Sequence, residues 1–173
     1  MGSQLRAMDL ARLNTAPADE ARERFLECCA ARPWADAMVA ARPFPDVAAV
    51  TSTADRAWWN LEERDWLEAF AAHPRIGEQA AGRNRFARWS RSEQAESADA
   101  DRSIAAALAA ANREYEDRFG HVFVVFATGK TAAEMLDLCR TRLGNDPEAE
   151  IRAAAAEQAK ITDLRLRKLL GIG

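Results

Sequence analysis

The chain has 173 residues and a mass of 19.1 kDa, which fits one domain covering residues 1–173 with a substantial core. With 24 Lys and Arg against 27 Asp and Glu, the net charge of −3 gives no electrostatic reason to expect a nucleic acid or an anionic membrane as a partner. The longest bulky apolar run, residues 122–126, is too short to span a bilayer and the N-terminus lacks the apolar core of a signal peptide, so we expect a cytoplasmic protein.

Prolines and capping residues divide the first half of the sequence into short helices. Bulky residues recur with helical rather than alternating spacing, which predicts an all-α fold, a single compact multi-helix domain. Asp19 and Asp46 are predicted helix caps, Pro33 ends a helix, and Asn60 with Glu63 forms a predicted capping box. The expected helices cover residues 4–15, 19–31, 34–42, 46–59 and 61–72.

The second half begins with a predicted surface loop, residues 78–91, whose four arginines are better explained as a solvated basic stretch than as an attractor of an anionic substrate. A helix over residues 100–118 should end at Gly120. Thr131 and Glu134 predict a capping box for a helix that ends near Leu143, and Asp146 caps a final helix over residues 147–170.

The run from Val122 to Ala127 is the one β-branched and aromatic stretch in the sequence. One strand cannot make a sheet, so we predict a short extended segment that passes along the core. Its backbone N–H groups then need acceptors, and a polar ligand is one source of them.

The three cysteines argue against a disulfide framework or a zinc site. Cys28, Cys29 and Cys139 are odd in number and show no C-x-x-C spacing, so we predict reduced cysteines that pack in the core. No metal site is expected, and the sequence contains neither a phosphate-binding loop nor an HExxH motif.

His73 is the best single candidate for acid–base chemistry. It precedes Pro74, which must end the preceding helix, and imidazole ionises near neutrality. A histidine at a helix end is nevertheless more often a capping or packing residue. The second histidine, His121, follows Gly120 in a predicted loop, and we expect it to be exposed.

Glu93 and Arg165 are the other two candidates, and each has a structural alternative. Glu93 forms a pair with His73 if its carboxylate faces a pocket, but Ser90-x-x-Glu93 is also a capping box that turns the carboxylate onto its own helix start. Arg165 falls in the middle of the apolar stripe of the last helix, formed by Ile151, Ala154, Gln158, Ile161, Leu169 and Ile172. A guanidinium there must find an anion, which is either a ligand or an acid on a neighbouring helix.

Six motifs carry a resemblance to a known family. They are Arg42-Pro43-Phe44, His73-Pro74-Arg75-Ile76-Gly77, Ser90-x-x-Glu93-Gln94, Tyr115-x-x-x-Phe119-Gly120-x-x-Phe123, Arg142-Leu143-x-Asn145-Asp146 and Leu164-Arg165-Leu166. Because the six motifs occur in this order and with this spacing, the chain resembles the 2-oxo-4-hydroxy-4-carboxy-5-ureidoimidazoline (OHCU) decarboxylases from about Leu10 to Leu170. It departs from them after Gln94, where Ala95-Glu96-Ser97 replaces a more glycine-rich continuation.

The resemblance implies an all-α, cofactor-free carboxy-lyase, commonly a homodimer, that converts OHCU to (S)-allantoin and CO2 in the last step of oxidative urate degradation. By position, His73, Glu93 and Arg165 match its catalytic residues, with His73 as a proton donor and Arg165 as the substrate arginine. The matched substrate-binding positions are Pro74, Ser90, Arg91, Ser92, Gln94, Phe123, Val124, Val125, Phe126 and Ala127. The sequence ends in Gly171-Ile172-Gly173 without a peroxisomal tripeptide, in keeping with the cytoplasm.

Two other interpretations stay open at this point. In the first, the protein is a non-catalytic helical interaction module in which the three candidate residues are structural. In the second, the same fold acts on another ureido or cyclic-amide acid, because a fold alone does not define a substrate.

Overall fold

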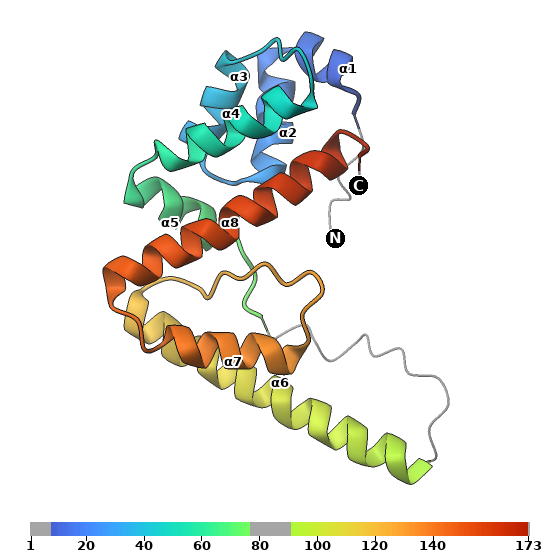
Figure 1. The fold of residues 1–173 in the computed structure, drawn as a ribbon, viewed down its shortest axis with the longest axis vertical. Coiled ribbons are helices and arrows are strands. Elements are labelled where there is room, and N and C mark those ends of the chain that lie inside the picture. The colour runs from blue at the N-terminus through green and yellow to red at the C-terminus, as the bar shows by residue number, and fades with distance from the viewer. Residues whose placement is uncertain (1–7, 77–90, 173) are drawn as a thin grey trace. The chain divides into compact units, whose positions relative to one another are not determined.

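The computed structural model describes residues 8–76 and 91–172, and for residues 91–99 it describes the backbone only. All regular secondary structure in these ranges is helical, as predicted (Figure 1). None of the helices within them combines the length and the hydropathy of a membrane span. The helices are α1 (Leu10–Thr15), α2 (Ala18–Cys28), α3 (Arg32–Ala40), α4 (Val47–Trp59), α5 (Glu63–Ala71), α6 (Arg91–Phe119), α7 (Ala132–Arg142) and α8 (Pro147–Leu169).

The chain divides into two compact units. The first contains the residues up to Ala72 together with those from Ala155 onward, and the second runs from His73 to Ala154. Helix α8 begins in the second unit and ends in the first. Because the first unit is built from both ends of the chain, no single cut separates the two units, and one domain covering residues 1–173 stays a prediction.

The first unit has an aromatic core in which indole N–H groups donate to backbone carbonyls. Trp34 donates to Ala54 O at 3.0 Å, and Trp58 donates to Ala155 O at 2.9 Å. The Phe25 and Trp34 rings meet edge to face, with centroids 6.0 Å apart. Each indole therefore buries its large apolar surface without leaving its polar group unpaired.

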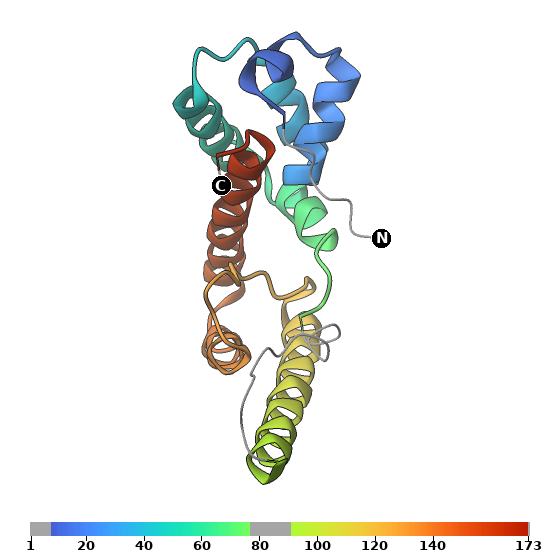
Figure 2. The same cartoon turned by 90° about the vertical axis from the view of Figure 1, so that its right-hand side faces the viewer.

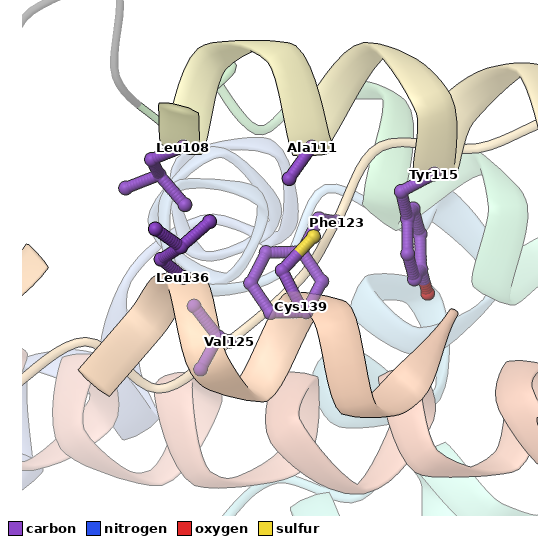
Figure 3. Packing of buried hydrophobic residues seen from close by; sticks show 7 residues of the cluster. All are labelled: Leu108, Ala111, Tyr115, Phe123, Val125, Leu136 and Cys139. Atoms are coloured by element: carbon purple, nitrogen blue, oxygen red, sulfur yellow. The ribbon is translucent and has the colours of Figure 1, made fainter. Parts of the chain in front are cut away.

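The second unit is built on α6 and α7, which lie side by side (Figure 2). Between them lies a cluster of buried side chains that includes Phe123 and Val125 of the extended segment (Figure 3). The other members are Leu108, Ala111, Tyr115, Leu136 and Cys139. The segment is thus packed into the core by alternate side chains, as expected for extended backbone.

Several predicted helix ends are confirmed by their hydrogen bonds. Asp46 accepts from Ala49 N at 2.8 Å, and Asp146 accepts from Ala149 N at 3.0 Å. Thr131 and Glu134 form the expected reciprocal capping box of α7. Gly120 ends α6 with a positive φ of 75°, a conformation that glycine adopts without steric cost.

Other predicted boundaries were wrong. The N-cap of α2 is Pro17, and Asp19 lies in the first turn of that helix. Pro33 does not stop a helix but lies in the first turn of α3, where its missing N–H is tolerated. Asn60 is the C-cap of α4, and Glu62 takes the capping position of α5, with Asp65 accepting from its N–H at 3.1 Å. These segments contain several capping residues close together, and spacing alone does not choose among them.

Helix α6 begins at Arg91, well before the predicted residue 100. Residues 91–99 are rich in Glu, Gln and Ala, which favour helix, but they carry no apolar stripe from which periodicity could have found them. Residues 78–90 of the predicted loop lie outside the described residues.

The three cysteines are free and buried, as predicted. Burial raises the pKa of the Cys28 thiol to about 12 and that of Cys29 to about 11.

Candidate active site

His73 lies directly after the C-cap residue of α5, so the predicted helix end before Pro74 is confirmed. Its side chain is half-buried. The segment that follows it is fixed to α6 by two contacts. Arg75 donates Nε and Nη2 to the two carboxylate oxygens of Glu116 at 2.8 and 2.9 Å, and Asn112 Nδ2 donates to Ile76 O. The Arg75 guanidinium also holds the pKa of Glu116 below its usual value.

The predicted Ser90–Gln94 motif stands at the start of α6. Ser90 is outside the described residues, while Arg91, Ser92, Glu93 and Gln94 are the first four helical residues. Glu93 therefore lies in the first turn, where the helix dipole favours a carboxylate. Whether its carboxylate faces a substrate or its own helix start stays a prediction, as does its pairing with His73.

The extended segment from Val122 to Ala127 is present without regular secondary structure, as predicted. Its carbonyl groups are held by the protein: Val124 O accepts from Arg142 Nη1, and Phe126 O accepts from Lys130 Nζ, both at 2.7 Å. The backbone N–H groups of Val124, Val125 and Ala127 have no acceptor among the described residues. Val124 and Val125 are 2% and 5% exposed, so these donors need a partner from elsewhere.

Behind this segment lies a buried ionic cluster that the sequence analysis missed. Arg142 donates Nε and Nη2 to Glu150 Oε1 at 2.8 and 2.5 Å, and the Tyr115 hydroxyl donates to the same oxygen. Asn145 Nδ2 donates to Glu150 Oε2 at 2.8 Å. The Phe123 ring lies against the guanidinium, with its centroid 4.7 Å from Arg142 Cζ.

The environment of this cluster keeps the Tyr115 phenol protonated. Glu150 is fully buried and Arg142 is 9% exposed, so each charge depends on the other for compensation. Burial, followed by the hydrogen bond to Glu150, raises the pKa of Tyr115, and the phenol stays a donor. Helical spacing offered a signal: Arg142 follows buried Leu136 and Cys139 on α7, and Glu150 lies four residues before buried Ala154 on α8.

His121 is 8% exposed, so the prediction of an exposed histidine was wrong. Gly120 turns the chain back, and the imidazole packs edge to face on Tyr115, with ring centroids 5.4 Å apart. Its Nδ1 lies 3.0 Å from Val122 O. The prediction rested on local sequence, a glycine stop followed by a loop. The imidazole is buried because aromatic residues on α6 pack against it.

Arg165 belongs to the first unit, where it is half-buried and donates Nη1 to Cys28 O at 3.3 Å. Among the described residues it forms no salt bridge, so the alternative of an acid on a neighbouring helix finds no support there. The predicted apolar stripe was partly wrong, since Ile161 is half-buried and Ile172 is 48% exposed. Gln158 and Leu169 of the predicted stripe are buried, and they share the buried face at this end of α8 with Thr162 and Leu166, which the stripe did not include.

The candidate residues are therefore distributed over both units. His73, the start of α6 and the extended segment belong to the second unit, and Arg165 belongs to the first. That they act on one substrate stays a prediction. Across residues 8–76 and 100–172, whose side chains the structure describes, no three His, Cys, Asp or Glu side chains gather into a possible metal site.

Comparison with known sequences gives a consistent set of relatives. The uric acid degradation bifunctional protein TTL of Arabidopsis thaliana is 40% identical over 146 residues, which cover 82% of this chain and 45% of that protein. The OHCU decarboxylase of Amia calva is 33% identical over 100 residues, 57% of each chain. The chain thus spans about half the length of these two relatives. The OHCU decarboxylase of Haloferax volcanii is 29% identical over 92% of this chain and 94% of that protein.

Solved structures and a family model agree with these sequence relatives. A crystal structure of an OHCU decarboxylase in the presence of (S)-allantoin matches with a TM-score of 0.71 and 36% identity, covering 87% of this chain and 98% of that chain. An (S)-allantoin synthase structure with a TM-score of 0.64 and 17% identity supports the fold alone. The family model described as OHCU decarboxylase matches residues 14–167. Since that match covers most of the chain, the protein belongs to the OHCU decarboxylase family.

Proposed function

We propose that this protein is an OHCU decarboxylase, a carboxy-lyase that converts OHCU to (S)-allantoin and CO2. The observation that carries the proposal is the family match over residues 14–167. It is supported by the Haloferax volcanii OHCU decarboxylase, whose length this chain covers almost completely. This reaction is the final step of oxidative urate degradation, and the name of the Arabidopsis thaliana relative refers to the same process.

The substrate provides its own electron sink. When the bond from C4 to the carboxylate breaks, the electron pair that CO2 leaves behind is delocalised into the adjoining imidazoline ring. The hydroxyl proton is then lost as the C4 carbonyl forms, the ring nitrogen that received the electron pair takes up one proton, and a second proton is added to the adjoining ring carbon from a single face. The protein has to turn the carboxylate out of the ring plane, stabilise the developing anion and deliver that proton.

Arg165 is the proposed anion-binding residue. Among the described residues its guanidinium has a single hydrogen bond, to the neutral Cys28 carbonyl, so donors remain for a carboxylate. His73 and Glu93 are the proposed acid–base pair. One of them takes the hydroxyl proton and the other serves the carbon, and as a coupled pair they set the pH dependence of the reaction together.

The remaining proposed contacts are to neutral groups of the substrate. The extended segment supports this role, because the N–H groups of Val124, Val125 and Ala127 have no acceptor among the described residues. Ser90 and Gln94 are assigned hydrogen bonds to the ureido group or the ring. We also propose, from the family resemblance, that the protein works as a homodimer in the cytoplasm.

The proposed function is tested by making the unstable OHCU in situ. Urate is treated with the two enzymes that precede this step, and the appearance of (S)-allantoin is followed by circular dichroism. Addition of the protein should accelerate the optically active signal in proportion to its concentration. A rate equal to that of uncatalysed OHCU decay would reject the decarboxylase and favour a helical interaction module.

Replacing Arg165 with methionine is expected to raise KM for OHCU by about 10- to 100-fold, because a charge-assisted hydrogen bond to the substrate is lost. The protein should stay folded, since the side chain is half-buried and has one neutral partner. The matched control is Arg167→Met, which removes an exposed arginine paired with Asp163 on the same helix. Normal KM in Arg165→Met would remove Arg165 from the site.

A further inference from the structure

Two cationic side chains hold the extended segment through its backbone carbonyl groups. Arg142 donates Nη1 to Val124 O, and Lys130 donates Nζ to Phe126 O, each at 2.7 Å. In addition, the backbone N–H of Lys130 donates to Ala127 O at 3.0 Å. The carbonyl oxygens of Val124, Phe126 and Ala127 are therefore all satisfied within the second unit.

The direction of two N–H groups follows from these contacts. A trans peptide unit is planar, and its N–H points opposite to its C=O. The Val124 carbonyl and the Val125 N–H share one peptide unit, so the N–H points away from Arg142. In the same way, the Ala127 N–H points away from the ammonium group that holds Phe126 O.

Neither N–H group has an acceptor among the described residues. Val125 is 5% exposed, with its side chain packed in the cluster between α6 and α7, so a missing acceptor there is costly (Figure 3). Ala127 is exposed and accessible to a ligand. In extended backbone, N–H groups two residues apart lie roughly 7 Å from each other, which suits two separate acceptor atoms of one small molecule.

The cations also strengthen these donors. A positive charge at a carbonyl oxygen polarises the whole peptide unit, and hydrogen bonds that run in series through one unit reinforce each other. The effect is greatest where water is excluded, as it is around Arg142, which is 9% exposed. Lys130 is half-buried and lies over the Phe126 ring, 5.6 Å from its centroid.

We propose that Arg142 and Lys130 are positioning residues, which orient and polarise the Val125 and Ala127 N–H groups to bind carbonyl oxygens of the substrate. The inference rests on the proposed decarboxylase function and assigns these residues no direct contact with OHCU. Glu150 fixes the Arg142 guanidinium from the opposite side through Nε and Nη2.

Lys130 offers the cleaner test because it is only half-buried, whereas Arg142 compensates a buried charge. Lys130→Met is expected to raise KM for OHCU by about 3- to 10-fold with kcat changed less, because one N–H loses its orientation toward the substrate. Lys130→Arg keeps a cationic donor and should restore most of the loss. Lys168→Met, an exposed lysine on α8, is the matched control.

A second measurement begins with the wild-type protein. When (S)-allantoin is titrated into the 15N-labelled wild-type protein, the Val125 and Ala127 amide protons should shift downfield. In Lys130→Met the Ala127 shift should shrink, while the melting temperature stays close to that of Lys168→Met. A purely structural lysine would change the melting temperature and leave the ligand-induced shift intact.

The outcomes separate the two proposals. An active wild-type protein whose Val125 and Ala127 signals do not respond to (S)-allantoin, or a Lys130→Met variant with wild-type KM, overturns the positioning role and leaves the decarboxylase standing. A wild-type protein without decarboxylase activity overturns the proposed function and the positioning role together.

Discussion

Replacing His73 with asparagine is expected to lower kcat by about 100- to 10,000-fold, the usual contribution of a general acid or base. Asparagine keeps a polar side chain of similar reach but cannot gain or lose a proton near neutrality. The residue is half-buried and follows the C-cap residue of α5, so the variant should fold normally. The rate of (S)-allantoin formation from OHCU made in situ measures the effect.

The chain offers its other histidine as a control. His121 packs on Tyr115 within the second unit, so His121→Asn should lower the melting temperature while kcat falls far less than in His73→Asn. The pH dependence of kcat/KM gives a further readout, because the loss of a proton-transferring group changes its shape. A His73→Asn variant with wild-type kcat would exclude the imidazole from proton transfer.

Replacing Arg142 with methionine is expected to destabilise the protein by about 3 to 5 kcal/mol, because Glu150 is then left as an uncompensated buried carboxylate. The lost donation to Val124 O adds to this cost. Urea unfolding followed by far-UV circular dichroism measures the change in the free energy of unfolding. The slope of this free energy against urea concentration is compared between variants.

Arg140→Met is the matched control for this variant, since Arg140 is exposed on the same helix and should change stability by less than about 0.5 kcal/mol. The double variant Arg142→Met with Glu150→Gln removes the buried charge together with its partner. It should be more stable than Arg142→Met alone. An equal loss of free energy of unfolding in Arg142→Met and Arg140→Met would mean that the ionic cluster contributes nothing to stability.

Local chemistry made much of the helical pattern predictable from sequence. The caps at Asp46, Thr131 and Asp146 and the stop at Gly120 act within one turn of the backbone, so their spacing in the sequence carries the information. The extended segment was predictable because a single β-branched run has no partner strand. The same local reasoning failed at Asn60, where Glu62 competes for the cap only two residues away.

The sequence by itself determined the all-α class, the helix end at His73, the extended segment and the motifs of the OHCU decarboxylase family. Tertiary structure alone decided the burial of His121 and the pairing of Arg142 with Glu150 and Tyr115. Such pairings join side chains from different helices, and a charge is stable inside the protein only when folding brings its counter-charge and hydrogen-bond partners to it. Helical periodicity reports which face of a helix is buried, but not which residue of another helix faces it.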